Sequence, residues 1–173
     1  MTLEDPRNLV DEFKGRSEQE IIHTLDSRGA ALEIAIENLE RDFNMGSIVR
    51  SANAFGVRHV HVIGRRQWNK RGAMATDRYL HVNYYATVKE FQVEMAHRRK
   101  AIIAVDNVPG ARDIRRTELP KDTVLVFGSE NAGISQEILQ ASSLVVEIRQ
   151  GGSTRSLNVA AAAAASMYEW CGQ

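Results

Sequence analysis

The sequence predicts an α/β protein with a mostly parallel β-sheet that is flanked by helices. Three observations support this prediction. Segments with strand-like and helix-like periodicity alternate along the chain. Some strand-like segments are continuous apolar runs, such as Ala101–Val105, which is typical of strands that are buried on both faces. The chain has 173 residues, 43% of them hydrophobic, and is therefore long enough to bury one substantial core.

The N-terminal segment is predicted to form a helical arm. Residues 2–14 favour a short helix or an ordered arm. Ser17 and Glu20 have the spacing of a capping box, in which each residue satisfies a backbone N–H of the other. This box would begin a helix that ends near Ser27, before Gly29.

The first strand and the helix after it are predicted from their apolar spacing. Leu32, Ile34 and Ile36 alternate with other residues, as in a strand. Apolar side chains then recur at helical intervals, and they are Met45, Ile48, Val49, Ala52 and Phe55. Gly56 follows as the expected C-terminal stop.

The rest of the chain continues the alternation. The further predicted strands are 57–63, 101–105, 124–127 and 144–148, and the further predicted helices are 87–98, 134–140 and 156–170. In the first of these helices, Val88, Phe91 and Met95 would share the buried face. We expect residues 1–30 to form the arm and residues 31–173 to form the α/β domain.

A run of alanines, Ala160–Ala165, lies in the last predicted helix. Alanine favours helix and has little bulk, so another helix can approach closely. The run is compatible with a helix that packs on the sheet of its own subunit, and equally with a two-fold helix contact in a dimer.

The overall composition excludes several classes of protein. Twenty-two basic residues balance twenty-two acidic ones, which argues against a nucleic-acid binder that relies on net charge and against an acidic disordered chain. No apolar run reaches the ~20 residues of a membrane span, and the first residues lack the features of a signal peptide. The single cysteine, Cys171, excludes an internal disulfide and a cysteine-rich metal site, so we expect a cytoplasmic protein without a metal.

The charges are nevertheless segregated along the chain. Residues 1–42 hold five basic and eleven acidic side chains, a net charge of −6. Residues 58–81 hold six basic and one acidic, a net charge of +5, and residues 98–116 hold six and two, a net charge of +4. The first basic block also carries histidines and aromatic residues, a mixture that suits RNA, although a solvated surface loop would have the same composition.

Three polar segments follow predicted strands, where ligands of open α/β sheets bind. In the first, Asn44 can cap a helix, Gly46 lets a ligand approach the backbone and Arg50 can reach a phosphate. The second is a loop between Gly128 and Gly133, which lacks the sequence of a phosphate-binding P-loop and of a dinucleotide fingerprint.

The third polar segment runs from residue 148 to residue 158. Ser156 is the expected N-cap of the last helix, with Asn158 in its first turn. A plain loop explains Ser156 but explains less well the further polar residues Ser153, Thr154 and Arg155.

Together, the three segments resemble the motifs of the SpoU (TrmH-like) class of SPOUT RNA methyltransferases. The resemblance rests on Asn44 with Arg50, on Gly128-x-Glu130-x-x-Gly133 and on Ser156-Leu157-Asn158-Val159, and it covers about residues 32–171. It implies a SPOUT fold with a C-terminal trefoil knot, a homodimer, and methyl transfer from S-adenosylmethionine to a ribose 2′-hydroxyl of tRNA or rRNA.

The resemblance also implies roles for individual residues. The implied catalytic or substrate-positioning residues are Asn44, Arg50, Glu130, Ser156 and Asn158. The implied cofactor-binding residues are Gly128, Ile148 and Leu157, and the basic residues expected to contact RNA are Arg65, Arg66, Lys70, Arg71 and Arg155. One departure is Arg149-Gln150, which stands where the family usually has Pro-Met.

Two other interpretations are compatible with parts of the sequence. A non-catalytic RNA-binding dimer could keep the same fold, although the intact set of motif residues argues against it. A nucleotide-dependent oxidoreductase is disfavoured, because the dinucleotide fingerprint is absent.

Overall fold

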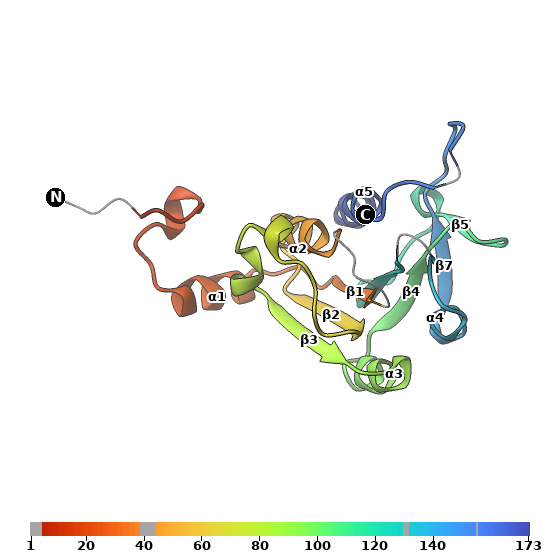
Figure 1. Ribbon diagram of the computed structural model, residues 1–173, viewed down its shortest axis with the longest axis horizontal. Helices are drawn as coiled ribbons and strands as arrows, with labels where there is room; N and C mark the ends of the chain where they lie inside the picture. Colours follow the sequence, from red (N-terminus) through yellow and green to blue (C-terminus); the bar gives the residue numbers. More distant parts are fainter. Residues whose placement is uncertain (1–4, 39–43, 130–131, 155) are drawn as a thin grey trace.

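A computed structural model describes residues 5–38, 44–129, 132–154 and 156–173 of the chain. These residues form a seven-stranded sheet in the order β3-β2-β1-β6-β4-β7-β5, and every pair of neighbouring strands is parallel. The strands are β1 (Glu33–Asn38), β2 (His59–Gly64), β3 (His81–Tyr85), β4 (Ala101–Val105), β5 (Arg112–Asp113), β6 (Thr123–Phe127) and β7 (Leu144–Glu147). The predicted α/β class is therefore confirmed (Figure 1).

Helices cover both faces of this sheet. The α-helices are α1 (Glu18–Ser27), α2 (Met45–Ala54), α3 (Val88–His97), α4 (Gln136–Ala141) and α5 (Val159–Cys171). Short 3₁₀ helices are η1 (Asp11–Phe13), η2 (Arg71–Ala73), η3 (Thr76–Tyr79) and η4 (Ile114–Arg116). Figure 1 shows α2 and α5 side by side on one face of the sheet, and α3 and α4 on the other face.

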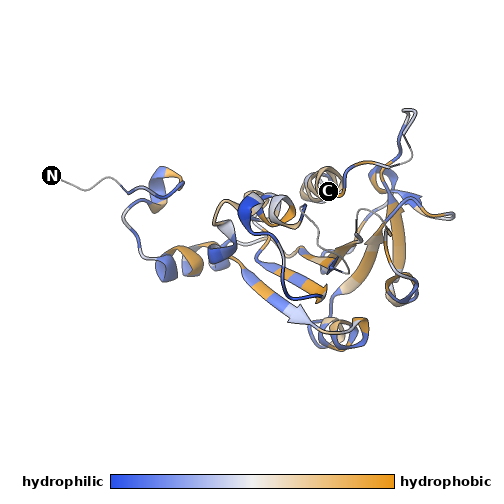
Figure 2. Ribbon diagram, viewed as in Figure 1, coloured by the Kyte–Doolittle hydropathy of each residue, from blue (hydrophilic) through white to orange (hydrophobic). Residues whose placement is uncertain are grey.

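The two faces bury separate apolar clusters because strand side chains alternate in direction. Ile34 and Ile36 of β1 pack with α2 and α5, whereas Ala35 between them packs with α3 and α4. Phe91 of α3 and Ile48 of α2 are both fully buried. The central strands are accordingly mostly hydrophobic in Figure 2.

The topology places the ends of the central strands together. The chain builds β1, β2 and β3 outward, crosses to β4, and then inserts β6 between β1 and β4. The winding direction reverses at this point, and the carboxyl ends of all strands meet at one edge because the sheet is parallel. Ligand sites of α/β sheets lie at such reversals.

Most predicted elements are confirmed, with shifts of a few residues at their ends. The capping box is present, since Glu20 N–H donates to Ser17 Oγ and Ser17 N–H donates to Glu20. The expectation that Ser156 caps the last helix is wrong. α5 begins at Val159, and the side chain of Asn158 is the N-cap, since its Oδ1 accepts hydrogen bonds from two backbone N–H groups.

The arm packs against the first basic block. Phe13 and Ile21 form a small apolar cluster with Tyr79 of η3. The Asp26 carboxylate lies 2.7 Å from Nε of Arg58, whose side chain is almost fully buried. Carboxylates of the arm thus neutralise part of the basic block, which lowers the charge available for an external partner.

A buried polar cluster lies at the start of β1. The Glu33 carboxylate is 2.7 Å from Nε2 of His61 and 2.6 Å from a guanidinium nitrogen of Arg98. Burial raises the pKa of Glu33, but the hydrogen bonds from His61 and Arg98 outweigh it and lower that pKa to about 2. Burial, together with the positive charge of Arg98, lowers the pKa of the neighbouring His59 to about 4.

The alanine-rich helix α5 packs within its own subunit along one face. Ala163 and Met167 are fully buried against the sheet and α2. Ala161, Ala165 and Tyr168 are exposed on α5, and Tyr168 is 71% exposed. In the part of the chain that the structure describes, no helix has the length and apolar character needed to cross a bilayer.

Candidate functional site

The start of α2 contains the first motif. Asn44 occupies the N-cap position, but its side chain makes no capping hydrogen bond, so that expectation is wrong. Its Oδ1 instead accepts a hydrogen bond from Nδ2 of Asn158, at 3.0 Å. Because Asn158 also caps α5, one side chain joins the N-termini of α2 and α5.

The same turn of α2 needs a glycine because the backbone of η2 lies against it. A Cβ on Gly46 would lie 2.8 Å from Gly72 Cα and from Ala73 N. The expectation was that Gly46 lets a ligand approach the backbone; in the structure, this space is filled by the protein's own backbone at Gly72 and Ala73. Arg50 lies exposed on the second turn of α2.

The loop after β6 is a tight turn, and the carboxylate of Asp106 accepts a hydrogen bond from it. Ser129 and Gly133 exchange backbone hydrogen bonds of 3.1 and 3.0 Å. A Cβ on Gly128 would lie 2.1 Å from Gly133 O, so this position excludes any side chain. Asp106, directly after β4, accepts a hydrogen bond of 3.0 Å from the N–H of Ile134. Glu130, the predicted carboxylate of this loop, lies outside the described residues.

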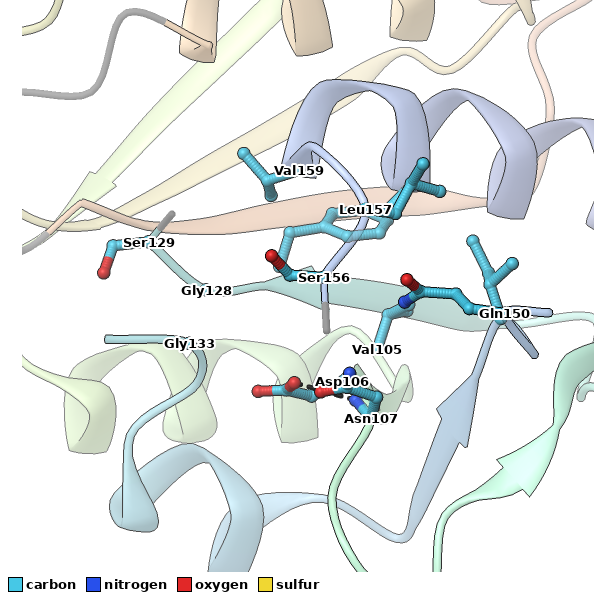
Figure 3. A pocket seen from close by; sticks show the side chains of 13 residues that line it. Val105, Asp106, Asn107, Gly128, Ser129, Gly133, Gln150, Ser156, Leu157 and Val159 are labelled. Carbon is cyan, nitrogen blue, oxygen red and sulfur yellow. Dashed lines mark hydrogen bonds between the residues drawn. The ribbon is translucent and has the colours of Figure 1, made fainter. Parts of the chain in front are cut away.

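A partly open cavity lies at the carboxyl ends of β4, β6 and β7. Its lining residues are Val105, Asp106, Asn107, Phe127, Gly128, Ser129, Gly133, Ile148, Gln150, Ser156, Leu157, Val159 and Ala162. Figure 3 shows Ser156 and Leu157 on one side of it and Asp106 and Asn107 on the other. The structure thus brings Gly128, Ile148 and Leu157, the residues expected to bind a cofactor, together with Ser156 at one cavity.

The chemistry of this lining suits a ligand that is part apolar and part polar. The apolar residues, among them Phe127 and Ala162, offer walls for a flat ring. Backbone groups around Gly128 and polar side chains such as Gln150 can accept or donate hydrogen bonds. The carboxylate of Asp106 can face a positive charge. A cationic nucleoside is therefore a suitable ligand.

Sequence reasoning missed the residues that β4 contributes to the cavity. Asp106 and Asn107 follow a predicted strand directly, so the rule that ligands bind at the carboxyl ends of strands was the available signal. Gln150 was noted as a departure from the family's pattern, and it lines the cavity.

The predicted RNA-contacting residues follow β2. Arg65, Arg66, Lys70 and Arg71 lie between the end of β2 and the start of η2, and each is exposed. Lys70 forms an ion pair of 2.7 Å with Asp77. Among the described residues, no carboxylate pairs with the other three arginines of this set. Arg155 lies outside the described residues.

Comparison with known proteins identifies the family. The model of the SpoU rRNA Methylase family matches residues 31–168. This chain belongs to that family. Among the described residues of this SpoU family member, no three histidine, cysteine, aspartate or glutamate side chains lie close enough together to hold a metal ion.

Two similar curated proteins are bacterial tRNA (guanosine(18)-2′-O)-methyltransferases. The one from Escherichia coli is 27% identical over 152 residues, which cover 86% of this chain and 66% of the relative. The one from Thermus thermophilus is 27% identical over 153 residues, which cover 86% of this chain and 78% of the relative.

Solved structures of SpoU proteins share the fold. AviRb from Streptomyces viridochromogenes, crystallised with AdoMet, aligns with a TM-score of 0.74 and 26% identity over 81% of this chain and 56% of its own. The TrmH/SpoU tRNA modifying enzyme of Aquifex aeolicus aligns with a TM-score of 0.79 and 24% identity over 90% of this chain and 81% of its own. This chain thus spans little more than half the length of AviRb and 66% of the E. coli relative.

Proposed function

We propose that this chain is an S-adenosylmethionine-dependent RNA methyltransferase that modifies a ribose 2′-hydroxyl in tRNA or rRNA. The observation that carries the proposal is the hydrogen bond between Asn158 and Asn44. It joins the segment that forms one side of the cavity, at Ser156 and Leu157, to the helix that carries Arg50. The names of the relatives, which act on the ribose of a tRNA guanosine, support the same reaction.

The cavity residues fit the cofactor. The apolar walls would hold the adenine ring, and backbone groups around Gly128, Ile148 and Leu157 would hydrogen-bond it. The Asp106 carboxylate would offset a positive charge of the ligand. When bound there, S-adenosylmethionine supplies an electrophilic methyl group. The walls of the partly open cavity would shield the reacting atoms from part of the solvent.

Arg50 would act on the RNA side of the site. A guanidinium is always protonated in proteins, so Arg50 cannot take up the proton of the ribose hydroxyl. Its positive charge would instead lower the pKa of that hydroxyl, and its planar fork would bind the adjacent phosphate through two hydrogen bonds. The proton then leaves to water or to the phosphate. Glu130 would orient this arginine or its loop, and Ser156 and Asn158 would supply polar contacts.

We further propose that the protein is a cytoplasmic homodimer with a trefoil knot. The exposed face of α5, where Ala161 and Ala165 lie beside the 71% exposed ring of Tyr168, supports a helix contact between two copies. The knot would lie where residues 148–158 lead into α5, beside the cavity. In the same proposal, residues 1–30 are an arm and residues 31–173 are the methyltransferase domain.

Methyl transfer to isolated RNA tests the function. The full chain would be incubated with methyl-labelled S-adenosylmethionine and either total tRNA or rRNA from a bacterium, and the RNA would then be digested to nucleosides. We expect label in a 2′-O-methylated nucleoside, and at least tenfold slower transfer by Arg50→Lys at saturating RNA. Absence of S-adenosylmethionine binding at millimolar concentration, measured by calorimetry, would overturn the proposal in favour of a non-catalytic RNA-binding dimer.

A further inference from the structure

An arginine lies over a tyrosine ring at the ends of β2 and β3, and a tryptophan is hydrogen-bonded to the hydroxyl of that tyrosine. The guanidinium carbon of Arg66 lies 4.8 Å from the centre of the Tyr84 ring. The indole N–H of Trp68 donates a hydrogen bond of 3.3 Å to the Tyr84 hydroxyl. We call Arg66, Trp68 and Tyr84 the Tyr84 stack. Figure 2 shows that the connection from β2 towards β3, which carries Arg66 and Trp68, is mainly hydrophilic.

Buried contacts fix the backbone and the aromatic rings of the Tyr84 stack. Asn38, at the end of β1, is 1% exposed, and its side-chain amide donates hydrogen bonds to the backbone oxygens of Arg65, at 2.5 Å, and Gln67, at 3.1 Å. Both carbonyls flank Arg66, so the backbone that carries this arginine is fixed on either side. Trp68 and Tyr84 are partly buried and pack against the apolar cluster around α2.

Arg66, the outermost residue of the Tyr84 stack, is accessible to a ligand. Arg66 is exposed, and no carboxylate among the described residues pairs with it. A guanidinium is flat and has two faces. Arg66 lies over the Tyr84 ring and is exposed overall, so a face of the guanidinium can be reached by a ligand. A lysine ammonium in the same place would have the charge but no flat face.

The stack lies on the same edge of the sheet as the cavity. Strands are spaced about 4.8 Å apart, and β3, which carries Tyr84, is three positions from β6, so the ends of these strands are roughly 14 Å apart. Figure 1 shows β1 between β2 and the strands that bear the cavity. A short piece of single-stranded nucleic acid spans such a distance.

We propose that the Tyr84 stack binds an unpaired base of the RNA, a few nucleotides away from the one that is presented to the cavity. Proteins read single-stranded RNA by stacking its bases on aromatic rings and on guanidinium planes. Here Tyr84 supports Arg66, and the base lies on the outer face of Arg66. This inference rests on the proposed function only in taking RNA as the substrate.

Binding of two oligonucleotides tests the proposal without methyl transfer. The probes are a twelve-nucleotide oligouridylate and a ribose-phosphate chain of the same length without bases, each measured by fluorescence anisotropy at low and moderate salt. Stacking of a base changes affinity roughly 5- to 150-fold. We expect the preference for the oligouridylate to fall at least fivefold in Tyr84→Ala and in Arg66→Lys. Arg66→Lys should keep the salt dependence of binding, because it keeps the charge.

Control variants separate stacking from charge and from folding. Arg65→Ala should weaken both probes equally, and Lys89→Ala, on α3 at the opposite face of the sheet, should change neither. The exposed position of Arg66 makes Arg66→Lys a variant that folds even if Tyr84→Ala does not.

The outcomes distinguish this proposal from the proposed function. Equal binding of both probes by the wild type, binding of neither, or an unchanged preference in Arg66→Lys would each overturn the stacking site. A protein that shows the preference but transfers no methyl group to tRNA or rRNA would keep the stacking site and lose the proposed function.

Discussion

The side chain of Asn158 contacts the N-termini of two helices. Its replacement should therefore have two separable effects, the first on stability and the second on methyl transfer. Its Oδ1 accepts hydrogen bonds from Ala160 N, at 3.0 Å, and Ala161 N, at 3.3 Å, while its Nδ2 donates to Asn44 Oδ1, at 3.0 Å. Asn158→Ala removes all three bonds. Asn158→Asp keeps the acceptor at the helix start but sets a carboxylate oxygen against Asn44 Oδ1.

The size of the first effect follows from these contacts. Loss of an N-cap side chain costs about 1–2 kcal/mol, and loss of the exposed hydrogen bond to Asn44 adds about 0.5 kcal/mol. We therefore expect Asn158→Ala to lower the free energy of unfolding by about 2 kcal/mol and Tm by roughly 4–8 °C. Asn158→Asp should stay within about 1 kcal/mol of the wild type, because aspartate caps helices well and its charge is favourable there.

Urea unfolding followed by circular dichroism measures the stability, and methyl transfer to tRNA measures the activity. Both variants should reduce kcat/KM at least tenfold, because both lose the link between α2 and α5. Thr87→Ala is the matched control. It removes the cap of α3, a hydrogen bond of 3.2 Å from Glu90 N, and should lower stability by about 1 kcal/mol while activity persists. Methyl transfer by Asn158→Asp at the wild-type rate, or unfolding as easy as that of Asn158→Ala, would contradict these two roles of Asn158.

Three further predictions concern the cavity loop, the buried histidine and the cavity carboxylate. Gly128→Ala should lower the free energy of unfolding by about 1–3 kcal/mol and weaken S-adenosylmethionine binding in calorimetry, whereas Gly151→Ala, where a Cβ meets nothing within 4 Å, should change neither. The pKa of His59 is about 4 in the folded chain against an ordinary 6.5, so the unfolded chain binds more protons between these values. Urea midpoints should therefore fall as the pH drops from 6.5 towards 4, and the fall should be smaller in His59→Gln; equal slopes would contradict this assignment. Asp106→Asn should weaken S-adenosylmethionine binding severalfold in calorimetry, and unchanged affinity would mean that the carboxylate does not face the cofactor's charge.

The elements with strong local signals were predicted well. The apolar spacing of Met45, Ile48 and Ala52 and the capping box at Ser17 both describe contacts within one turn or one helix face, which a single sequence contains. β3 was missed because every residue of it is half-buried at the edge of the sheet, so polar and apolar side chains are both tolerated. The pairing of β1 with β6 was not predicted, since the choice between strand partners depends on the packed helices and not on local sequence.

In the candidate site, too, features with a local sequence signal were predicted and features that depend on the packed fold were not. The three motif segments were recognised, because each combines a strand end, a glycine and polar residues. Ser156 was predicted to be the N-cap of the last helix, but Asn158 is the N-cap. Both residue types cap helices, and only the path of the loop decides between them. The net charge of residues 58–81 overestimates the positive charge that an RNA could meet, because Arg58 and Lys70 form ion pairs within the chain.

The insertion of β6 beside β1 has a consequence for synthesis on the ribosome. Glu33 of β1 lies opposite Val124 of β6, so one edge of β1 has no partner while the intervening residues are translated. A strand with an open edge and an apolar centre, here residues 34–36, can pair with other chains, and long-range pairings form slowly. The nascent chain is therefore most prone to wrong pairing during this interval. The cavity itself is completed only when Ala162 has been translated, because this residue of α5 is part of its lining.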